Sequence, residues 1–196
     1  YLDYPQAPLI FETRGLPRSK EAQKSWGDSM DRHRNSRVGV IVQCEGGHVL
    51  VPSYVEAVIY DSSGREMKRF KGGANHHQNW LRAIAARDAS MLNAPILEGH
   101  ISSGLCHLGG ISHQLGEKVA ANDIAAEIVN NDLLSFSFER MASHLRANDV
   151  DVDGNALTLG PWLELDPDKE NFNGNSQANA LLTRDYREPV MHPHLA

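Results

Sequence analysis

The sequence predicts an α+β fold: an open, mainly antiparallel β-sheet with helices packed on one face and an irregular C-terminal tail. Two observations lead to this prediction. Up to residue 70, short segments alternate between apolar and polar residues, as strands do, and glycine-containing turns separate them. From residue 75 onward, apolar residues instead recur every three or four positions, as they do along one face of a helix.

The strand-like part contains a single segment and two hairpins. Residues 9–16 alternate in character and are rich in strand formers, so we expect a strand there. Residues 38–51 predict a hairpin with its turn at 45–47, and residues 54–70 predict a second one with its turn at 61–64. Residues 17–37 are polar, with four arginines and two lysines, and predict a solvated loop with a short helix and a basic rim.

Helical periodicity begins at residues 75–88, where Asn75 is the expected N-cap. Further helices are expected at 97–116, 120–132 and 133–149. In the last of these, a core-facing stripe has His144 beside it and consists of Leu134, Phe138, Met141 and Leu145. The final 40 residues are rich in Asn, Asp, Gly and Pro. They predict a tail wrapped over the domain and held by Trp162, Leu163, Leu165, Phe172 and Tyr186.

The helix expected at 97–116 has two faces. An apolar seam is made of Ile101, Leu105, Leu108, Ile111 and Leu115, which predicts a packing helix. A polar stripe lies on another face and contains His100, Ser103, His107, Gly110 and Gln114. The small residues Ser102, Gly104, Gly109 and Gly110 predict that another element approaches closely. The stripe is either part of a site or a set of histidines satisfied in a core or an interface.

Metal binding is not favoured by the spacing of the polar residues. His100 and His107 would lie roughly 10 Å apart along a helix axis, too far to share one zinc ion. Residues 149–155 begin like a calcium loop, but the twelfth position is Gly160 instead of glutamate, so they predict a polar turn. His76 and His77 lie at an expected helix N-terminus, where they either face an anionic ligand or cap the helix at the surface.

The remaining motifs exclude several classes of chemistry. Cys44 and Cys106 form neither a disulfide framework nor a zinc spacing, and we expect both thiols to be reduced and buried. No G-x-S-x-G and no G-x-G-x-x-G is present, so the chain carries neither a nucleophile elbow nor a dinucleotide fingerprint. No metal and no bound cofactor is expected in this chain.

Composition bounds the partners and the organisation of the chain. Its 196 residues suit one domain, and its net charge of −6 argues against nucleic acid or an anionic membrane as the main partner. No apolar run approaches the length of a membrane span. The chain begins without Met and enters strand-like sequence directly, so we expect a fragment of a longer protein. Its localisation stays open between cytoplasm and periplasm.

Residues 76–116 also carry a family resemblance. The matching positions are His77, Asn79 to Leu81, Ala83–Ile84, and Glu98-Gly99-His100 through Leu115-Gly116. This segment resembles the C-terminal domain of the Gfo/Idh/MocA oxidoreductases, and within them the bacterial NADH-dependent dehydrogenase-like branch. The tail, with its Tyr-Arg-x-Pro at 186–189, is similar to that branch as well.

The resemblance implies that residues 1–196 form a single substrate-binding and oligomerisation domain, with homo-oligomers formed through the sheet. NAD or NADP would be held by an N-terminal Rossmann domain that this chain lacks. Hydride would then pass between the nicotinamide and a sugar, a polyol or a similar carbohydrate. The family's E-K-P lysine and its Asp/His pair are both missing, so no catalytic residue is expected here and the isolated chain should be inactive.

The substrate-binding residues expected on this basis are His76, His77, Glu98, His100, Ser103 and His107, with Arg14 and Arg18 as weaker candidates. Two alternatives stay open. The chain could belong to an NAD-dependent glycosidase-like relative, or to a non-catalytic carbohydrate-binding or scaffold protein of the same fold.

Overall fold

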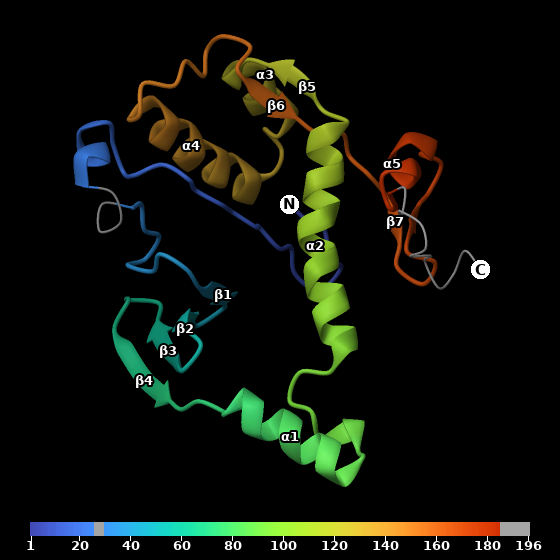
Figure 1. Ribbon diagram of the computed structural model, residues 1–196. Coiled ribbons are helices and arrows are strands. Elements are labelled where there is room, and N and C mark those ends of the chain that lie inside the picture. The colour runs from blue at the N-terminus through green and yellow to red at the C-terminus, as the bar shows by residue number, and fades with distance from the viewer. Residues whose placement is uncertain (26–29, 185–196) are drawn as a thin grey trace. The chain divides into compact units, whose positions relative to one another are not determined.

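The structure is a computed structural model that describes residues 1–25 and 30–184 (Figure 1). The chain consists of two compact units. The sheet unit comprises Glu12–Gly99 and Ala147–Asp149. The helical unit comprises Tyr1–Phe11, His100–Arg146 and the described residues from Val150 onward. This division into two units does not test the prediction that residues 1–196 form one domain, which stays a prediction.

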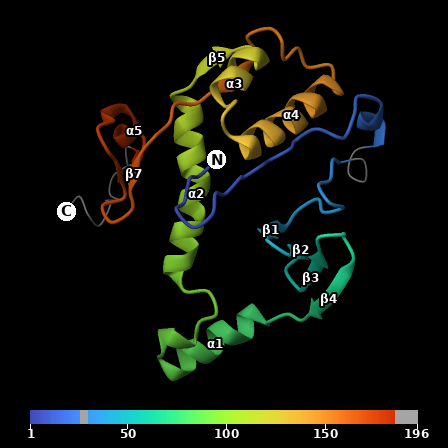
Figure 2. The same ribbon diagram turned by 180° about the vertical axis from the view of Figure 1, so that it is seen from behind.

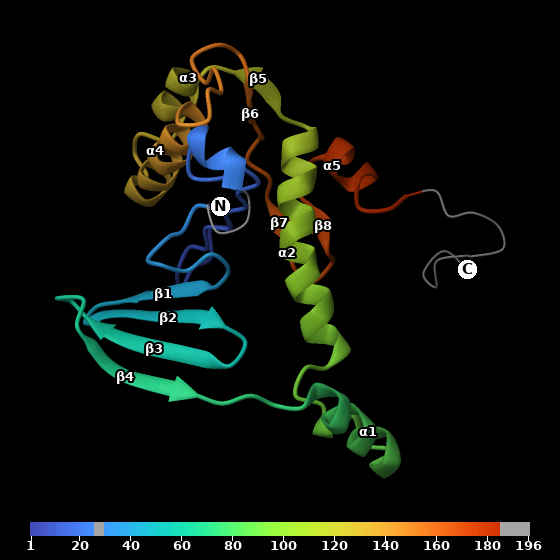
Figure 3. The same cartoon turned by 60° about the vertical axis from the view of Figure 1, so that its left-hand side comes forward.

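Four antiparallel strands form the sheet, in the order β1-β2-β3-β4, and consecutive strands are neighbours (Figure 3). They are β1 (Val40–Cys44), β2 (Gly47–Ser53), β3 (Glu56–Asp61) and β4 (Glu66–Lys71). Both predicted hairpins are therefore confirmed, as is the α+β class with its antiparallel sheet. Gly47 closes the first hairpin with a φ of 147°, and a Cβ atom there would lie 2.0 Å from the carbonyl oxygen of Tyr60. Only glycine fits this position.

The two faces of the sheet differ in exposure. On one face, Leu50 opposes Val58, and these side chains are only 7% and 1% exposed. The strand register places another set of side chains on the opposite face. We call this set the apolar sheet face: Val40, Val42, Val49, Val51, Ile59 and Phe70. Val40, Val42 and Phe70 remain 46–55% exposed, so this face is open among the residues that the structure describes.

The sheet unit also contains helix α1 (His76–Ala86) and the short 3-10 helices η1 (Glu21–Ser25) and η2 (Ala89–Met91). Asn75 caps α1 as predicted, because its side-chain oxygen accepts a hydrogen bond of 3.0 Å from the backbone N–H of Gln78. Asn79 then ties α1 to the segment that follows. Its side chain donates to the carbonyl of Met91 at 2.7 Å and accepts from the N–H of Asn93 at 3.0 Å.

The strand predicted at residues 9–16 is wrong. Leu9 forms only an isolated bridge with Leu2, and residues 10–16 belong to no strand. Alternating side chains favour an extended backbone, but a strand also needs a partner that takes up its hydrogen bonds. The sheet ends at β1 and β4 without using this segment.

The helical unit holds most of α2 (Ile96–Gln114), whose first residues belong to the sheet unit. It continues with the elements β5 (Glu117–Val119), α3 (Ala121–Glu127), α4 (Asp132–Arg146), β6 (Leu157–Leu159), β7 (Leu165–Asp166), β8 (Asn171–Phe172) and α5 (Ser176–Ala180) (Figures 1 and 2). Strand β5 pairs with β6 and β7 with β8, both antiparallel. The predicted helices are thus all present, and the C-terminal tail carries short elements of its own.

Two apolar clusters form the core of this unit. The first joins α3, α4 and the β5–β6 pair around the buried residues Ala121, Ile124, Ile128, Val152 and Leu157. The second joins the C-terminal half of α2 to the tail, around Ile111, Phe172 and Ala178. Among the described residues, no helix is both long enough and apolar enough to span a membrane.

Some residues expected in these cores are outside them. Leu134, Phe138 and Leu145 pack on the first cluster, but Met141 is 39% exposed. Leu108 and Leu115 pack on the second cluster, but Ile101 is 50% exposed because the packing partners of α2 begin further along the helix. In the tail, Leu163, Leu165 and Phe172 do hold the chain to α2, whereas Trp162 is 63% exposed and Tyr186 lies outside the described residues.

Two further predictions about α2 and the cysteines are wrong. Apart from the backbone of α2 itself, no described atom lies within 4 Å of a Cβ built at Gly104, Gly109 or Gly110, so no element within residues 1–25 and 30–184 approaches them closely. The close approach occurs instead at Gly160, where a Cβ atom would lie 2.1 Å from Ser112 Oγ, because the chain returns there along the end of α2. For the cysteines, only the predicted burial is wrong: Cys44 on β1 and Cys106 on α2 are free thiols, but both are exposed in the described part of the chain.

Candidate functional site

Three of the predicted site residues lie together on α2. His100, Ser103 and His107 are three and four residues apart, which places them on one face of the helix, and all three are exposed. We call this set the α2 polar face. Its first residue is oriented by the tail, since His100 Nε2 lies 2.7 Å from Glu170 Oε1. Because a carboxylate only accepts hydrogen bonds, the imidazole donates from Nε2.

The other predicted site residues belong to the sheet unit. His76 and His77 form the first turn of α1, and Glu98 lies in the first turn of α2, all three exposed. Arg14 forms ion pairs with Asp31 and Glu12, so its charge is neutralised locally. Arg18 is exposed. His100, Ser103 and His107 thus share one face of α2, and the other predicted site residues lie outside that face.

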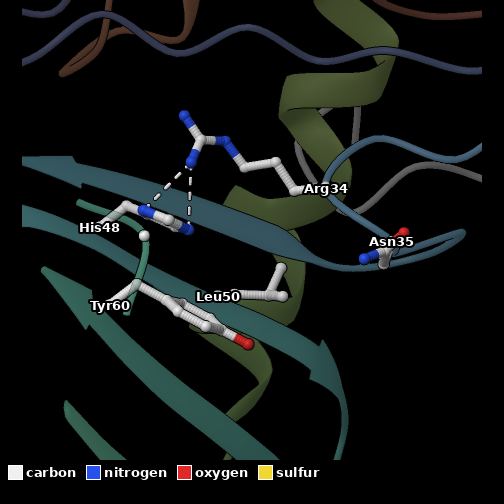
Figure 4. Close-up of a pocket in the computed structure, with 6 residues that line it drawn as sticks. Arg34, Asn35, His48, Leu50 and Tyr60 are labelled. Carbon is white, nitrogen blue, oxygen red and sulfur yellow. Dashed lines mark hydrogen bonds between the residues drawn. The ribbon is translucent and has the colours of Figure 1, made fainter. Parts of the chain in front are cut away.

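A second candidate site is a hollow of about 210 Å³ in the sheet unit (Figure 4). We call it the Arg34 pocket. It is lined by Arg34, Asn35, His48, Leu50, Tyr60 and Gly64. Strands β2 and β3 supply His48, Leu50 and Tyr60, which share the covered face of the sheet. The segment before β1 supplies the first two residues.

A tight turn positions Arg34 and Asn35. The backbones of His33 and Ser36 exchange two hydrogen bonds of 2.9 and 3.0 Å, and the two residues between them have φ values of 49° and 63°. Two consecutive left-handed residues define a type I′ turn. Asparagine tolerates this conformation, whereas arginine adopts it at some cost. The turn carries the Arg34 side chain over β2 (Figure 4).

The wall of the pocket is a stack of rings below a cation (Figure 4). The rings of His48 and Tyr60 are stacked, with centroids 4.9 Å apart and planes 14° from parallel. Arg34 Nη1 lies 3.1 Å from each ring nitrogen of His48. Partial burial and, to a smaller extent, the Arg34 charge lower the pKa of His48 below its ordinary value. The neutral form of His48 is therefore favoured, and Arg34 carries the permanent positive charge of this pocket.

In the described part of the chain, no group of three or more His, Cys, Asp or Glu side chains is placed so that it could hold a metal ion. In residues 149–155, Asp151 accepts from the N–H groups of Asp153 and Gly154 at 3.2 and 3.0 Å. Asp153 also accepts from Arg146. These contacts form the polar turn that the sequence predicts.

Sequence reasoning missed Glu170 and the Arg34 pocket. Glu170 is 70 residues from His100, and nothing local marks it. The sequence contains a weak indication of the pocket, because the two predicted hairpins place His48 and Tyr60 on neighbouring strands. Their register, with His48 directly opposite Tyr60, is what brings the rings together.

Comparison of the chain with models of protein families, with curated proteins and with solved structures gave no match. The resemblance to the Gfo/Idh/MocA oxidoreductases therefore stays a prediction.

Proposed function

We propose that this chain is the C-terminal substrate-binding and oligomerisation domain of an NAD(P)-dependent oxidoreductase acting on a sugar, a polyol or a similar carbohydrate. The observation that supports this function best is the α2 polar face, with two imidazoles and a hydroxyl on one exposed side of a helix. NAD or NADP would be bound by a Rossmann domain outside this chain. The nicotinamide would supply or accept the hydride.

The α2 polar face suits a ligand rich in hydroxyl groups. Imidazole and hydroxyl groups both donate and accept hydrogen bonds, as sugar hydroxyls do. Several such contacts are needed to hold one C–H bond of a polyol in a fixed direction. The contact with Glu170 orients the His100 ring, which reduces the freedom lost when a ligand binds.

The apolar sheet face supports the oligomerisation part of the proposal. Val40, Val42 and Phe70 are about half exposed on one open side of the sheet. Contiguous exposed apolar surface usually marks an interaction site. A twofold dimer would cover the same patch on both copies with a single contact.

The substrate proposal can be tested by titrating sugars and polyols into the 196-residue chain and following the imidazole C–H signals by NMR. We expect the His100 and His107 signals to shift saturably with at least one ligand. His107→Gln should weaken that ligand about tenfold, the effect of losing one good hydrogen bond. The matched control is His113→Gln, an exposed histidine on another side of α2.

Two outcomes would contradict the proposal. One is that no sugar or polyol moves the His100 and His107 signals. The other is that His107→Gln and His113→Gln weaken binding equally, which would make the effect unspecific. NAD and NADP added alone should leave the spectrum unchanged, because the dinucleotide fingerprint is missing from this chain.

A further inference from the structure

The turn at residues 33–36 contacts the covered face of the sheet through the side chain of Arg34 (Figure 4). We propose that this turn is a pH-sensitive latch: it stays on strand β2 while His48 is neutral, and it leaves the strand when the His48 imidazole takes up a proton. The latch belongs to the sheet unit and uses no residue of the α2 polar face, so it is independent of the function proposed above.

The contact between Arg34 and His48 is the first argument. Arg34 Nη1 lies 3.1 Å from each ring nitrogen of His48, and the Tyr60 ring stacks on the imidazole with centroids 4.9 Å apart. A neutral imidazole keeps one ring nitrogen that can accept a hydrogen bond from the guanidinium, whereas both nitrogens of an imidazolium are donors. Protonation of His48 therefore removes the acceptor and brings two positive charges into contact, which repel each other.

The surroundings of the ring do not offset a second positive charge. Among the described residues that face His48, Arg34 is the charged group that acts on it, Gln43 on β1 is uncharged and Tyr60 on β3 is a phenol. Partial burial and, to a smaller extent, the Arg34 charge lower the pKa of His48. Because linkage is reciprocal, a closed turn that disfavours the proton implies a proton that disfavours the closed turn. The other residues that line the pocket are also uncharged: Asn35, Leu50 and Gly64.

Backbone strain in the turn is the second argument. Arg34 has a φ of 49°, in the left-handed region that is unfavourable for a residue with a Cβ atom, whereas Asn35 at 63° tolerates it better. Such strain persists only while the surroundings hold the residue in place, and the contact with His48 is one such restraint. Loss of that contact therefore frees a turn that already favours another conformation.

The chain after the turn limits how far the movement extends. A Cβ atom at Gly39 would lie 2.4 Å from the carbonyl oxygen of Val51, so the backbone is held closely against β2 from that point. Release of residues 33–36 should therefore leave β1 paired with β2. Since Arg34 and Asn35 line the pocket, their departure should open it and give Leu50, only 7% exposed here, more contact with water.

The test is an NMR titration of the isotope-labelled 196-residue chain from about pH 7.5 to about pH 4.5, which spans the range where histidine changes its charge. At the higher pH we expect a nuclear Overhauser effect between the Arg34 side chain and the His48 ring, and rigid Arg34 and Asn35 amides. On acidification the side-chain effect should disappear and the two amides should become mobile, both with the midpoint of the His48 titration. A turn that stays in place while His48 titrates would overturn the proposal.

Variants assign the response to His48. In His48→Gln the new side chain can accept from Arg34 but cannot titrate, so the turn should stay closed over the whole range. His33, in the turn itself, titrates in both proteins, so a turn that opens equally in His48→Gln would overturn the proposal. The matched control His76→Gln removes an exposed imidazole from α1 and should open like the wild type. Loss of the opening in this control would make the response unspecific and would also overturn the proposal.

A second variant decides the question should His48→Gln fail to fold. Arg34→Gly removes the charge, and glycine adopts a φ of 49° without strain. The Asn35 amide should therefore stay rigid from about pH 7.5 to about pH 4.5, although His48 still titrates. A turn that opens in acid in Arg34→Gly would contradict the roles assigned to the charge and to the strain of Arg34.

Discussion

At the scale of single residues, the surroundings of His48 affect the charge of its imidazole. Three elements surround its ring on the covered face of the sheet. Arg34 faces it from the turn before β1, Tyr60 from β3 and the uncharged Gln43 from β1. Burial and the nearby cation both disfavour the imidazolium form, which is why the pKa of His48 is lowered.

This lowered pKa predicts how stability depends on pH. Well above the ordinary pKa of 6.5, His48 is neutral in both the folded and the unfolded state and does not make stability depend on pH. As the pH falls below 6.5 and through the lower folded pKa, the unfolded state binds the proton first, so stability is lost. Urea unfolding at about pH 7.5 and about pH 5 should show a larger loss for the wild type than for His48→Gln.

The same pKa can be measured directly by NMR titration of the imidazole. Arg34→Gln should raise the pKa of His48 only part of the way to 6.5, because burial is the larger cause and remains in the variant. A His48 pKa at or above 6.5 in the wild type, or equal losses of stability in the two proteins, would contradict this account.

At the scale of elements, α2 is anchored at one end. Its C-terminal half packs through Leu108, Ile111 and Leu115 on the tail, and Gly160 meets Ser112 at close range. Around Gly104, Gly109 and Gly110, no other described part of the chain covers the helix surface. A glycine at an uncovered helix position makes no packing contact that would compensate for the flexibility of its backbone. Compared with alanine, it lowers the stability of the helix by about 1 kcal/mol.

Two glycine substitutions should therefore act in opposite directions. Gly109→Ala should stabilise the protein by roughly 0.5–1 kcal/mol, since it adds helix propensity and meets no atom. Gly160→Ala should destabilise it by about 1–3 kcal/mol, because the new methyl group overlaps Ser112 and the backbone must shift. Urea unfolding followed by circular dichroism measures both. A loss of stability in Gly109→Ala would show that α2 is covered there.

At the scale of the whole molecule, the chain has two compact units with separate roles in the proposals. The helical unit carries its own apolar clusters and the α2 polar face. The sheet unit carries the Arg34 pocket on one side of the sheet and the apolar sheet face on the other. The Arg34 pocket and the apolar sheet face thus lie on opposite sides of the same four strands.

Association through the apolar sheet face can be tested by measuring the molar mass of the protein in solution by sedimentation. We expect the wild-type chain, of 21.7 kDa, to sediment as a dimer at tens of micromolar, and Val42→Lys to sediment as a monomer. The control is Val129→Lys, which places the same charge at a valine that is 63% exposed in the helical unit. A monomeric wild type would contradict the proposal, as would dissociation of the dimer by both variants.

Particular elements show how far the sequence was sufficient for prediction. The hairpins, α1 with its Asn75 cap, and α2 to α4 follow from turns, caps and periodicity within a few neighbouring residues. The strand at 9–16 failed because pairing depends on a partner elsewhere in the chain. Ile101 and Met141 show the same limit, since their helices were predicted but the extent of their packing partners was not.

By itself, the sequence determined the α+β class, the place of most helices and strands, and the α2 polar face, because these depend on local periodicity. Only the tertiary structure decided that Glu170 meets His100, that Arg34 lies over His48, and that the described residues leave one side of the sheet open. The physical reason is that these contacts join residues that are far apart in the sequence or that meet only because of a turn or of the register between two strands. A local sequence pattern does not determine which such residues come close in space.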